Sequence, residues 1–135
     1  MPQATTHRWS KFFLLATAMM MALAATQVKA ADSKIEGPME DVGKAFKKIK
    51  KIVKDGEYED VSTLTSFMAE KMESVKNEEP PQAKERTSEF PGLMDESIAA
   101  VKKLGEAKDY ASLKASFMDM GMSCKKCHDI FQPEE

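Results

Sequence analysis

The sequence predicts an all-α protein, an antiparallel up-down-up-down bundle of four helices. Three observations support this fold class. Apolar residues recur every three or four positions in four segments between residues 38 and 131, the spacing of one buried helix face. No segment shows the period-two alternation of a half-buried strand. Two of the connections, 56–59 and 105–108, are so short that the helices they join must run antiparallel.

The first thirty residues have the pattern of a cleaved secretory signal peptide. Arg8 and Lys11 form a positive start, and residues 12–25 are an uncharged, largely apolar run of 14 residues. Val28 and Ala30 suit the positions before a cleavage site. An uncleaved membrane anchor is the alternative, although the run is short for a membrane span. We therefore expect a signal peptide over 1–30, a periplasmic domain over 31–135, and no stable membrane insertion after cleavage.

The charge of the chain argues against a nucleic-acid partner. Residues 1–30 hold three of the 20 basic residues and none of the 22 acidic residues, so residues 31–135 carry a formal charge of −5. This segment of 105 residues can bury one modest core. His128 is the only histidine in it.

The first predicted helix begins at Gly37-Pro38 and ends at Asp55-Gly56. Proline suits the first turn of a helix, and the acidic residues that follow suit its positive end. Its apolar face consists of Met39, Val42, Phe46, Ile49 and Val53. Six lysines lie between positions 44 and 54. A solvated face is their ordinary explanation, and a docking patch for an acidic partner is the alternative.

The second predicted helix runs from about Asp60 to Lys76. Its apolar residues keep the same spacing: Val61, Leu64, Met68, Met72 and Val75. Pro80-Pro81 prevents its continuation. Residues 77–90 are charged and aperiodic, which predicts a crossing loop.

The third and fourth predicted helices complete the bundle. The third begins between Pro91 and Met94 and ends near Gly105. Its apolar residues are Met94, Ile98, Val101 and Leu104. The fourth opens near Asp109. Its apolar face consists of Leu113, Phe117, Met120, Cys124, Cys127 and Phe131.

The pentapeptide Cys124-Lys125-Lys126-Cys127-His128 predicts covalent attachment of one haem c. Two thiols one turn apart can add to the two vinyl groups of haem as thioethers, and the adjacent imidazole can bind the iron. Both cysteines continue the buried face, so the helix would deliver both sulfurs to the inside of the bundle. Gly121, one turn earlier, could let the porphyrin approach the backbone, or could be an ordinary helix glycine.

Other chemistries of these residues were weighed: a disulfide, a thioredoxin-like redox pair and part of a zinc site. A redox pair is expected near a βαβ pattern, and a zinc site needs a fourth ligand that residues 31–135 do not offer. The run Met118-Asp119-Met120-Gly121-Met122 raises copper binding, but residues two apart on a helix point to opposite sides. No His or Cys remains as a catalytic base or nucleophile, so we expect no enzyme.

Over residues 35–132 the chain resembles the class II c-type cytochromes, the cytochrome c-prime family. The likeness rests on two stretches: Met39 to Gly43, and Gly121, Cys124, Cys127, His128, Asp129 and Phe131. The chain departs from the family at Ile35 and Gln132, where members commonly carry arginine, and it has no tryptophan in the crossing region. The resemblance implies haem near the C-terminus of a four-helix bundle. Many relatives pair two bundles through the first two helices, so a homodimer and a monomer both stay open here.

Met39 is the candidate distal ligand of the iron. Antiparallel first and fourth helices would bring it to the same end of the bundle as His128, and the family's distal position falls on it. A methionine on a helical apolar face is also an ordinary core residue, so both interpretations stay open. With Met39 bound, the iron would be low-spin and the function electron transfer with redox partner proteins. With an open iron, the chain would resemble the five-coordinate relatives that bind nitric oxide or carbon monoxide.

Overall fold

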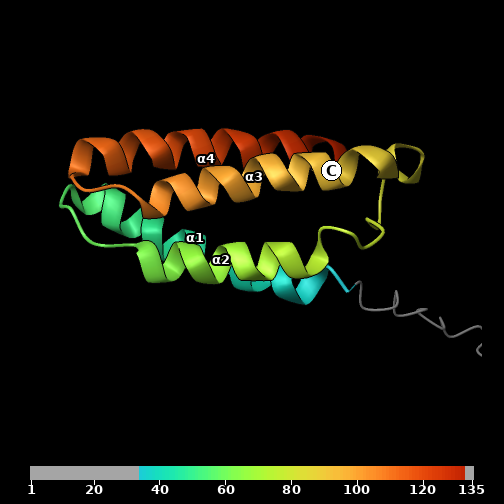
Figure 1. Ribbon diagram of the computed structural model, residues 1–135, viewed down its shortest axis with the longest axis horizontal. Helices are drawn as coiled ribbons and strands as arrows, with labels where there is room; N and C mark the ends of the chain where they lie inside the picture. The colour runs from blue at the N-terminus through green and yellow to red at the C-terminus, as the bar shows by residue number, and fades with distance from the viewer. Residues whose placement is uncertain (1–33, 133–135) are drawn as a thin grey trace, which may run out of the picture. The chain divides into compact units, whose positions relative to one another are not determined.

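The computed structural model describes residues 34–132, and the expected signal peptide of residues 1–30 lies outside them. The four α-helices are α1 (Glu36–Asp55), α2 (Ser62–Val75), α3 (Phe90–Gly105) and α4 (Tyr110–Phe131), with a 3-10 helix η1 (Lys84–Glu89) before α3. No strand occurs within 34–132. The prediction of an all-α four-helix bundle is therefore confirmed (Figure 1). Within the same residues, no helix is both long enough and apolar enough to cross a membrane.

Ion pairs between neighbouring helices show that the chain alternates in direction. Asp41 near the start of α1 pairs with Lys71 near the end of α2 at 3.1 Å, and Lys34 before α1 pairs with Glu78 after α2 at 3.3 Å. Early residues of one helix meet late residues of the next, as antiparallel packing requires. The remaining cross-helix pairs are Lys76–Asp95 and Lys102–Glu73 between α2 and α3, and Lys103–Asp119 and Lys126–Glu96 between α3 and α4. In each set, the residue number falls on one helix as it rises on the other.

The contact between α1 and α4, called here the α1–α4 seam, closes the bundle. The ring of Phe46 stacks on the ring of Phe117, with centroids 5.1 Å apart and planes inclined by 24°. The Tyr110 hydroxyl donates a hydrogen bond of 2.9 Å to the carbonyl oxygen of Val53. From the first contact to the second, the chain advances seven residues along α1 and goes back seven along α4. The two helices are therefore antiparallel with matched spacing, although they touch less than the other neighbouring pairs.

The helix ends follow the local signals in the sequence. α1 stops at Gly56, whose φ of 82° lies in the left-handed region that glycine adopts without strain. α4 begins after Asp109, whose carboxylate accepts a hydrogen bond of 2.8 Å from the backbone N–H of Ser112. The Ser112 hydroxyl oxygen in turn accepts from the Asp109 N–H at 3.3 Å. This reciprocal capping box fixes where α4 starts.

The crossing segment between α2 and α3 contains a helix that the sequence did not predict. Residues 77–90 were expected to be an aperiodic loop, but 84–89 form η1. Polar groups hold this 3-10 turn: the Thr87 hydroxyl donates to the Lys84 carbonyl at 2.8 Å, and Arg86 makes two hydrogen bonds of 2.7 Å with Glu89. None of the η1 residues is buried, so its sequence has no repeating apolar positions from which the turn could be predicted.

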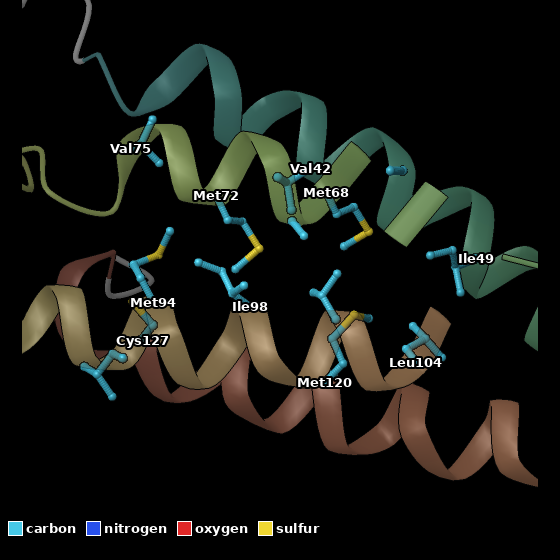
Figure 2. Close-up of a cluster of buried hydrophobic side chains, with 14 of the residues drawn as sticks. Val42, Ile49, Met68, Met72, Val75, Met94, Ile98, Leu104, Met120 and Cys127 are labelled. Atoms are coloured by element: carbon cyan, nitrogen blue, oxygen red, sulfur yellow. The ribbon is translucent and has the colours of Figure 1, made fainter. Parts of the chain in front are cut away.

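Methionine supplies much of the core. Met68, Met72, Met94 and Met120 are each at most 2% exposed and lie among aliphatic residues of all four helices (Figure 2). The predicted apolar face of α4 also points inward. Its members Leu113, Met120, Cys127 and Phe131 are buried, while Phe117 and Cys124 are half-buried against the same cluster. The pattern that predicted the helices is therefore the pattern that forms the core.

Candidate haem site

The last two turns of α4 present the pentapeptide as a single unit. Cys127 is buried, at 6% exposure, Cys124 is half-buried against the core, and His128 is exposed. Figure 2 shows Cys127 at the same end of the buried cluster as Met94 and Val75. The two thiols are free rather than joined in a disulfide. One helix segment therefore carries both sulfurs and the imidazole.

The environment of the thiols does not suit a thioredoxin-like pair. Burial raises the pKa of Cys124. Burial, and after it the charge of Cys124, raises the pKa of Cys127 to about 11. Reactive redox cysteines need a lowered pKa, because the thiolate is the nucleophile. These thiols stay protonated at neutral pH in the polypeptide.

Two ion pairs flank the motif and stabilise its helical form. The amine of Lys125 contacts both carboxylate oxygens of Asp129, one turn later, at 2.6 and 2.8 Å. Lys126 pairs with Glu96 of α3 at 2.7 Å. The two residues between the cysteines therefore point to surface partners and leave the sulfurs to the interior. Between residues 34 and 132, no three His, Cys, Asp or Glu side chains gather in a way that could hold a metal ion by themselves.

Met39 lies in the first turns of α1, at the end of the bundle where α4 carries the pentapeptide. It is half-buried and sits two turns before Phe46, whereas Cys124 sits two turns after Phe117. Two turns of a helix return to nearly the same face, so Met39 shares the face of α1 on which Phe46 meets α4. The antiparallel stacking of Phe46 on Phe117 therefore supports a position of Met39 near the level of Cys124. A contact of Met39 with the pentapeptide stays a prediction.

Each of the two helices has a glycine between its phenylalanine and its candidate haem-site residue. Gly43 lies between Met39 and Phe46 on α1, and Gly121 lies between Phe117 and Cys124 on α4. A Cβ added to either glycine would meet no heavy atom within 4 Å. Gly105 differs, since its Cβ would collide with the Thr65 side chain where α2 and α3 approach closely. Gly37, Gly56 and Gly92 likewise have nothing within 4 Å of an added Cβ, so Gly43 and Gly121 behave as ordinary surface glycines in this respect.

One buried side-chain hydroxyl on α3 has no hydrogen-bond partner. The hydroxyl of Ser97 on α3 is buried, with 1% exposure of the residue, and it makes no hydrogen bond; within 34–132 it is the single such side-chain atom. Its neighbour Glu96 pairs with Lys126, next to Cys127. A buried donor without a partner costs stability.

These residues fit a covalently held haem. Two inward sulfurs and an adjacent imidazole on one helix, with the thioether of Met39 toward the same end of the bundle, form a suitable donor set. The model of one protein family, described as cytochrome C′, matches residues 20–132. The chain belongs to the cytochrome c-prime family. No curated protein and no solved structure matched the chain.

Membership of the cytochrome c-prime family gives the general class of function. The family binds haem c and comprises electron carriers and gas-binding proteins rather than classical enzymes. Its members are typically periplasmic and often dimeric.

The sequence indicates some of these features and not others. A motif indicates the pentapeptide and a topological argument indicates Met39, and their roles at an iron stay predictions. The unpartnered hydroxyl of Ser97 was not predicted, because its burial depends on how the helices are rotated and shifted against one another. No spacing in the sequence signals it.

Proposed function

We propose that the chain is a periplasmic electron carrier with one haem c, bound through thioethers to Cys124 and Cys127 and held by His128 and Met39 as axial ligands. The observation that supports this proposal is the antiparallel stacking of Phe46 on Phe117, because two turns back along α1 lead to Met39 and two turns forward along α4 lead to Cys124. The haem, when bound, supplies a reversible one-electron couple between ferric and ferrous iron.

The residues of the chain have separate tasks in this proposal. Cys124 and Cys127 tether the ring, so that the cofactor stays with the polypeptide in both oxidation states. His128 is exposed in the polypeptide alone and is therefore free to turn toward the iron. Met39 would complete the coordination from α1, and a thioether as the sixth ligand raises the reduction potential of a c-type haem.

The absorption spectra of the oxidised and reduced protein, with and without Met39→Ala, test the ligation. We expect a low-spin wild-type protein that takes up carbon monoxide slowly, and a high-spin Met39→Ala variant. Val42→Ala serves as a control on the same helix, because Val42 is buried one turn away and has no ligand atom. A high-spin wild type that Met39→Ala leaves unchanged would contradict Met39 ligation.

Gas binding is the second candidate function, supported by the half-buried position of Met39 against the core, which also suits a packing residue. In this alternative Met39 packs above the ring and leaves the iron five-coordinate. Nitric oxide or carbon monoxide would then bind rapidly to the reduced wild-type protein. Equal carbon monoxide binding rates for wild type and Met39→Ala would favour this function over electron transfer.

Export and assembly are part of the proposal. A signal peptide over residues 1–30 would place the mature N-terminus at or close to Ala31, which intact-mass measurement of the purified protein checks. Full-length protein recovered from a membrane fraction would instead support an anchored cytochrome.

Two bundles would pair through α1 and α2, and sedimentation equilibrium would show a dimer; a monomer at all concentrations would contradict this pairing.

A further inference from the structure

The cationic side chains of the bundle fall into two groups. Within residues 34–132, most lysines and the single arginine form ion pairs with carboxylates. The structure shows no ion pair for six lysines: Lys47, Lys48, Lys50, Lys54, Lys108 and Lys114. Four of the six lie in the second half of α1, although the domain as a whole is acidic.

The α1–α4 seam brings four of these lysines together. On α1, Lys50 lies between Phe46 and Val53, the two residues that contact α4. On α4, Lys114 lies between the partners of those residues, Phe117 and Tyr110. Both lysines are exposed, so they border the same stretch of the seam on its outer side.

Lys47 and Lys54 extend this group along α1. They lie three residues before and four residues after Lys50, spacings that keep side chains on one face of a helix. All three are exposed. The nearby carboxylate of Asp55 is already paired with Lys51 at 2.7 Å.

Two exposed methionines continue the row on α4. Met118 and Met122 follow Lys114 at intervals of four residues and are 60% and 64% exposed. They contrast with Met68, Met72, Met94 and Met120, which are buried. Lys47, Lys50, Lys54 and Lys114 together with Met118 and Met122 are called the basic surface below. It is apolar in part, locally positive, and leads along α4 toward the pentapeptide.

We propose that the basic surface docks an acidic protein that exchanges electrons with this chain. The proposal rests on the electron-transfer function proposed above. Exposed thioethers can form the apolar centre of a contact, while unpaired lysines at its rim attract carboxylates without first giving up an internal partner. Because residues 31–135 carry a net charge of −5, a positive region of this kind would orient an approaching acidic partner.

The basic surface is close enough to the expected haem to affect reagents that reach it. Lys114 precedes His128 by 14 residues, or about 21 Å along the helix axis. The Debye length is about 30 Å at 0.01 M ionic strength and about 10 Å at 0.1 M. The field of the lysines therefore reaches the pentapeptide end of α4 at low salt and is screened at moderate salt.

Small redox reagents of opposite charge test the field. Ferrous holoprotein gives one electron to hexacyanoferrate(III), an anion, or to tris(phenanthroline)cobalt(III), a cation, and the reagent is reduced by that electron. The net charge alone predicts that oxidation by the anion speeds up as salt is added. We expect the opposite, a fall of about tenfold between low and moderate ionic strength, from steering by the basic surface.

Two fourfold lysine-to-glutamine variants of equal net charge separate the surface from the rest of the chain. The first replaces Lys47, Lys50, Lys54 and Lys114. The control replaces four exposed lysines elsewhere: Lys34, Lys84, Lys102 and Lys103. Glutamine is about as compatible with a helix as lysine, so both variants should fold. We expect the first variant to lose the fall in rate with salt and the control to keep it.

Binding of poly-L-glutamate gives a readout that does not depend on electron transfer. In holoprotein with carbon-13 methionine methyl groups, we expect the signals of Met118 and Met122 to shift on titration and those of Met68 and Met72 to stay. The first variant should lose the shifts. Vesicles with anionic phosphatidylglycerol should not displace the polymer at the same ionic strength.

The outcomes separate the two proposals. Normal spectra and potential, with unchanged salt dependence in the first variant or no methionine shifts, would overturn the docking surface alone. Displacement of poly-L-glutamate by the vesicles would replace the protein partner with a membrane. A high-spin protein that binds the polymer through Met118 and Met122 would overturn the electron-carrier assignment and leave an acidic-protein binding surface.

Discussion

The two ends of the α1–α4 seam are built differently. At the end near the α2 start, Phe46 stacks on Phe117 and Tyr110 bonds to the Val53 carbonyl. The other end, called the open end below, holds Met39, Gly43, Gly121 and Cys124. The contact between α1 and α4 is smaller than the contacts of the other neighbouring helices, and the ring stacking and the hydrogen bond belong to the packed end. The packed end sets the register from which the positions of the candidate ligands are predicted.

Removal of both cysteines, which lie at the open end, should have the largest effect, the loss of covalently bound haem. A Cys124→Ala, Cys127→Ala double variant should bind no haem covalently, because both thioethers are lost. Acid–acetone extraction of the denatured protein followed by a haem stain checks this. Ser123→Ala is a matched control on the same turn. Covalent haem in the double variant, or extractable haem in the wild type, would contradict attachment at these cysteines.

Phe117→Ala should weaken the packed end. Full burial of a phenylalanine makes its truncation cost 3–5 kcal/mol, but Phe117 is half-buried, so we expect about 2–3 kcal/mol including the lost ring contact. Urea unfolding measures the change. Phe67→Ala, which alters an exposed ring on α2, should cost much less. A double variant with Phe46→Ala should cost less than the sum of the single changes.

Gly121→Ala should stabilise the polypeptide without haem and hinder the formation of the haem-bound protein. Without haem, the added methyl group meets nothing, and alanine is the better helix former, so the polypeptide should gain about 0.5–1 kcal/mol. If the porphyrin approaches the helix there, the same methyl group should lower the yield of holoprotein. Gly105→Ala is the contrasting variant and should destabilise both forms, because its Cβ collides with Thr65. Stabilisation of both forms by Gly121→Ala would mean that the ring does not approach this face.

Asp109→Asn should have the smallest effect and concerns the start of α4 at the packed end. Hydrogen bonds from Ser112 lower the pKa of Asp109. Its stabilising contribution is therefore present above the unfolded-state pKa of the carboxyl group and is lost as the pH falls through the lowered value in the folded state. Asparagine caps without titrating, so the variant should lose this part of the acid dependence of unfolding. A wild-type acid dependence kept in the variant would contradict the assignment.

Helix content and direction were readable from the sequence, whereas register was not. Apolar spacing marked the four helices, and Gly56 and Asp109 marked ends that the structure confirms. The η1 turn was missed, since polar bonds such as Thr87 to Lys84 hold it and no apolar face reports it. The relative rotation of α1 and α4 depends on the stacking of Phe46 on Phe117, a contact between residues far apart in the chain.

The candidate site shows the same division. Cys124, Cys127 and His128 lie within five residues, so a local pattern suffices to find them. Met39 was inferred from topology; the structure supports the antiparallel arrangement behind that inference, and the ligand role of Met39 stays a prediction. The unpartnered hydroxyl of Ser97 could not be inferred, because a serine on a helix usually finds a backbone or water partner.

The methionine-rich core suggests how one bundle could exist both before and after haem attachment. Met68, Met72, Met94 and Met120 are unbranched and flexible, so each can fill differently shaped gaps at low cost. Branched aliphatic side chains in the same places would shape a cavity for one state only. A core of this kind can close over its own interior while the chain awaits the cofactor and yield that volume when the ring arrives, so α4 would reach the attachment step already folded.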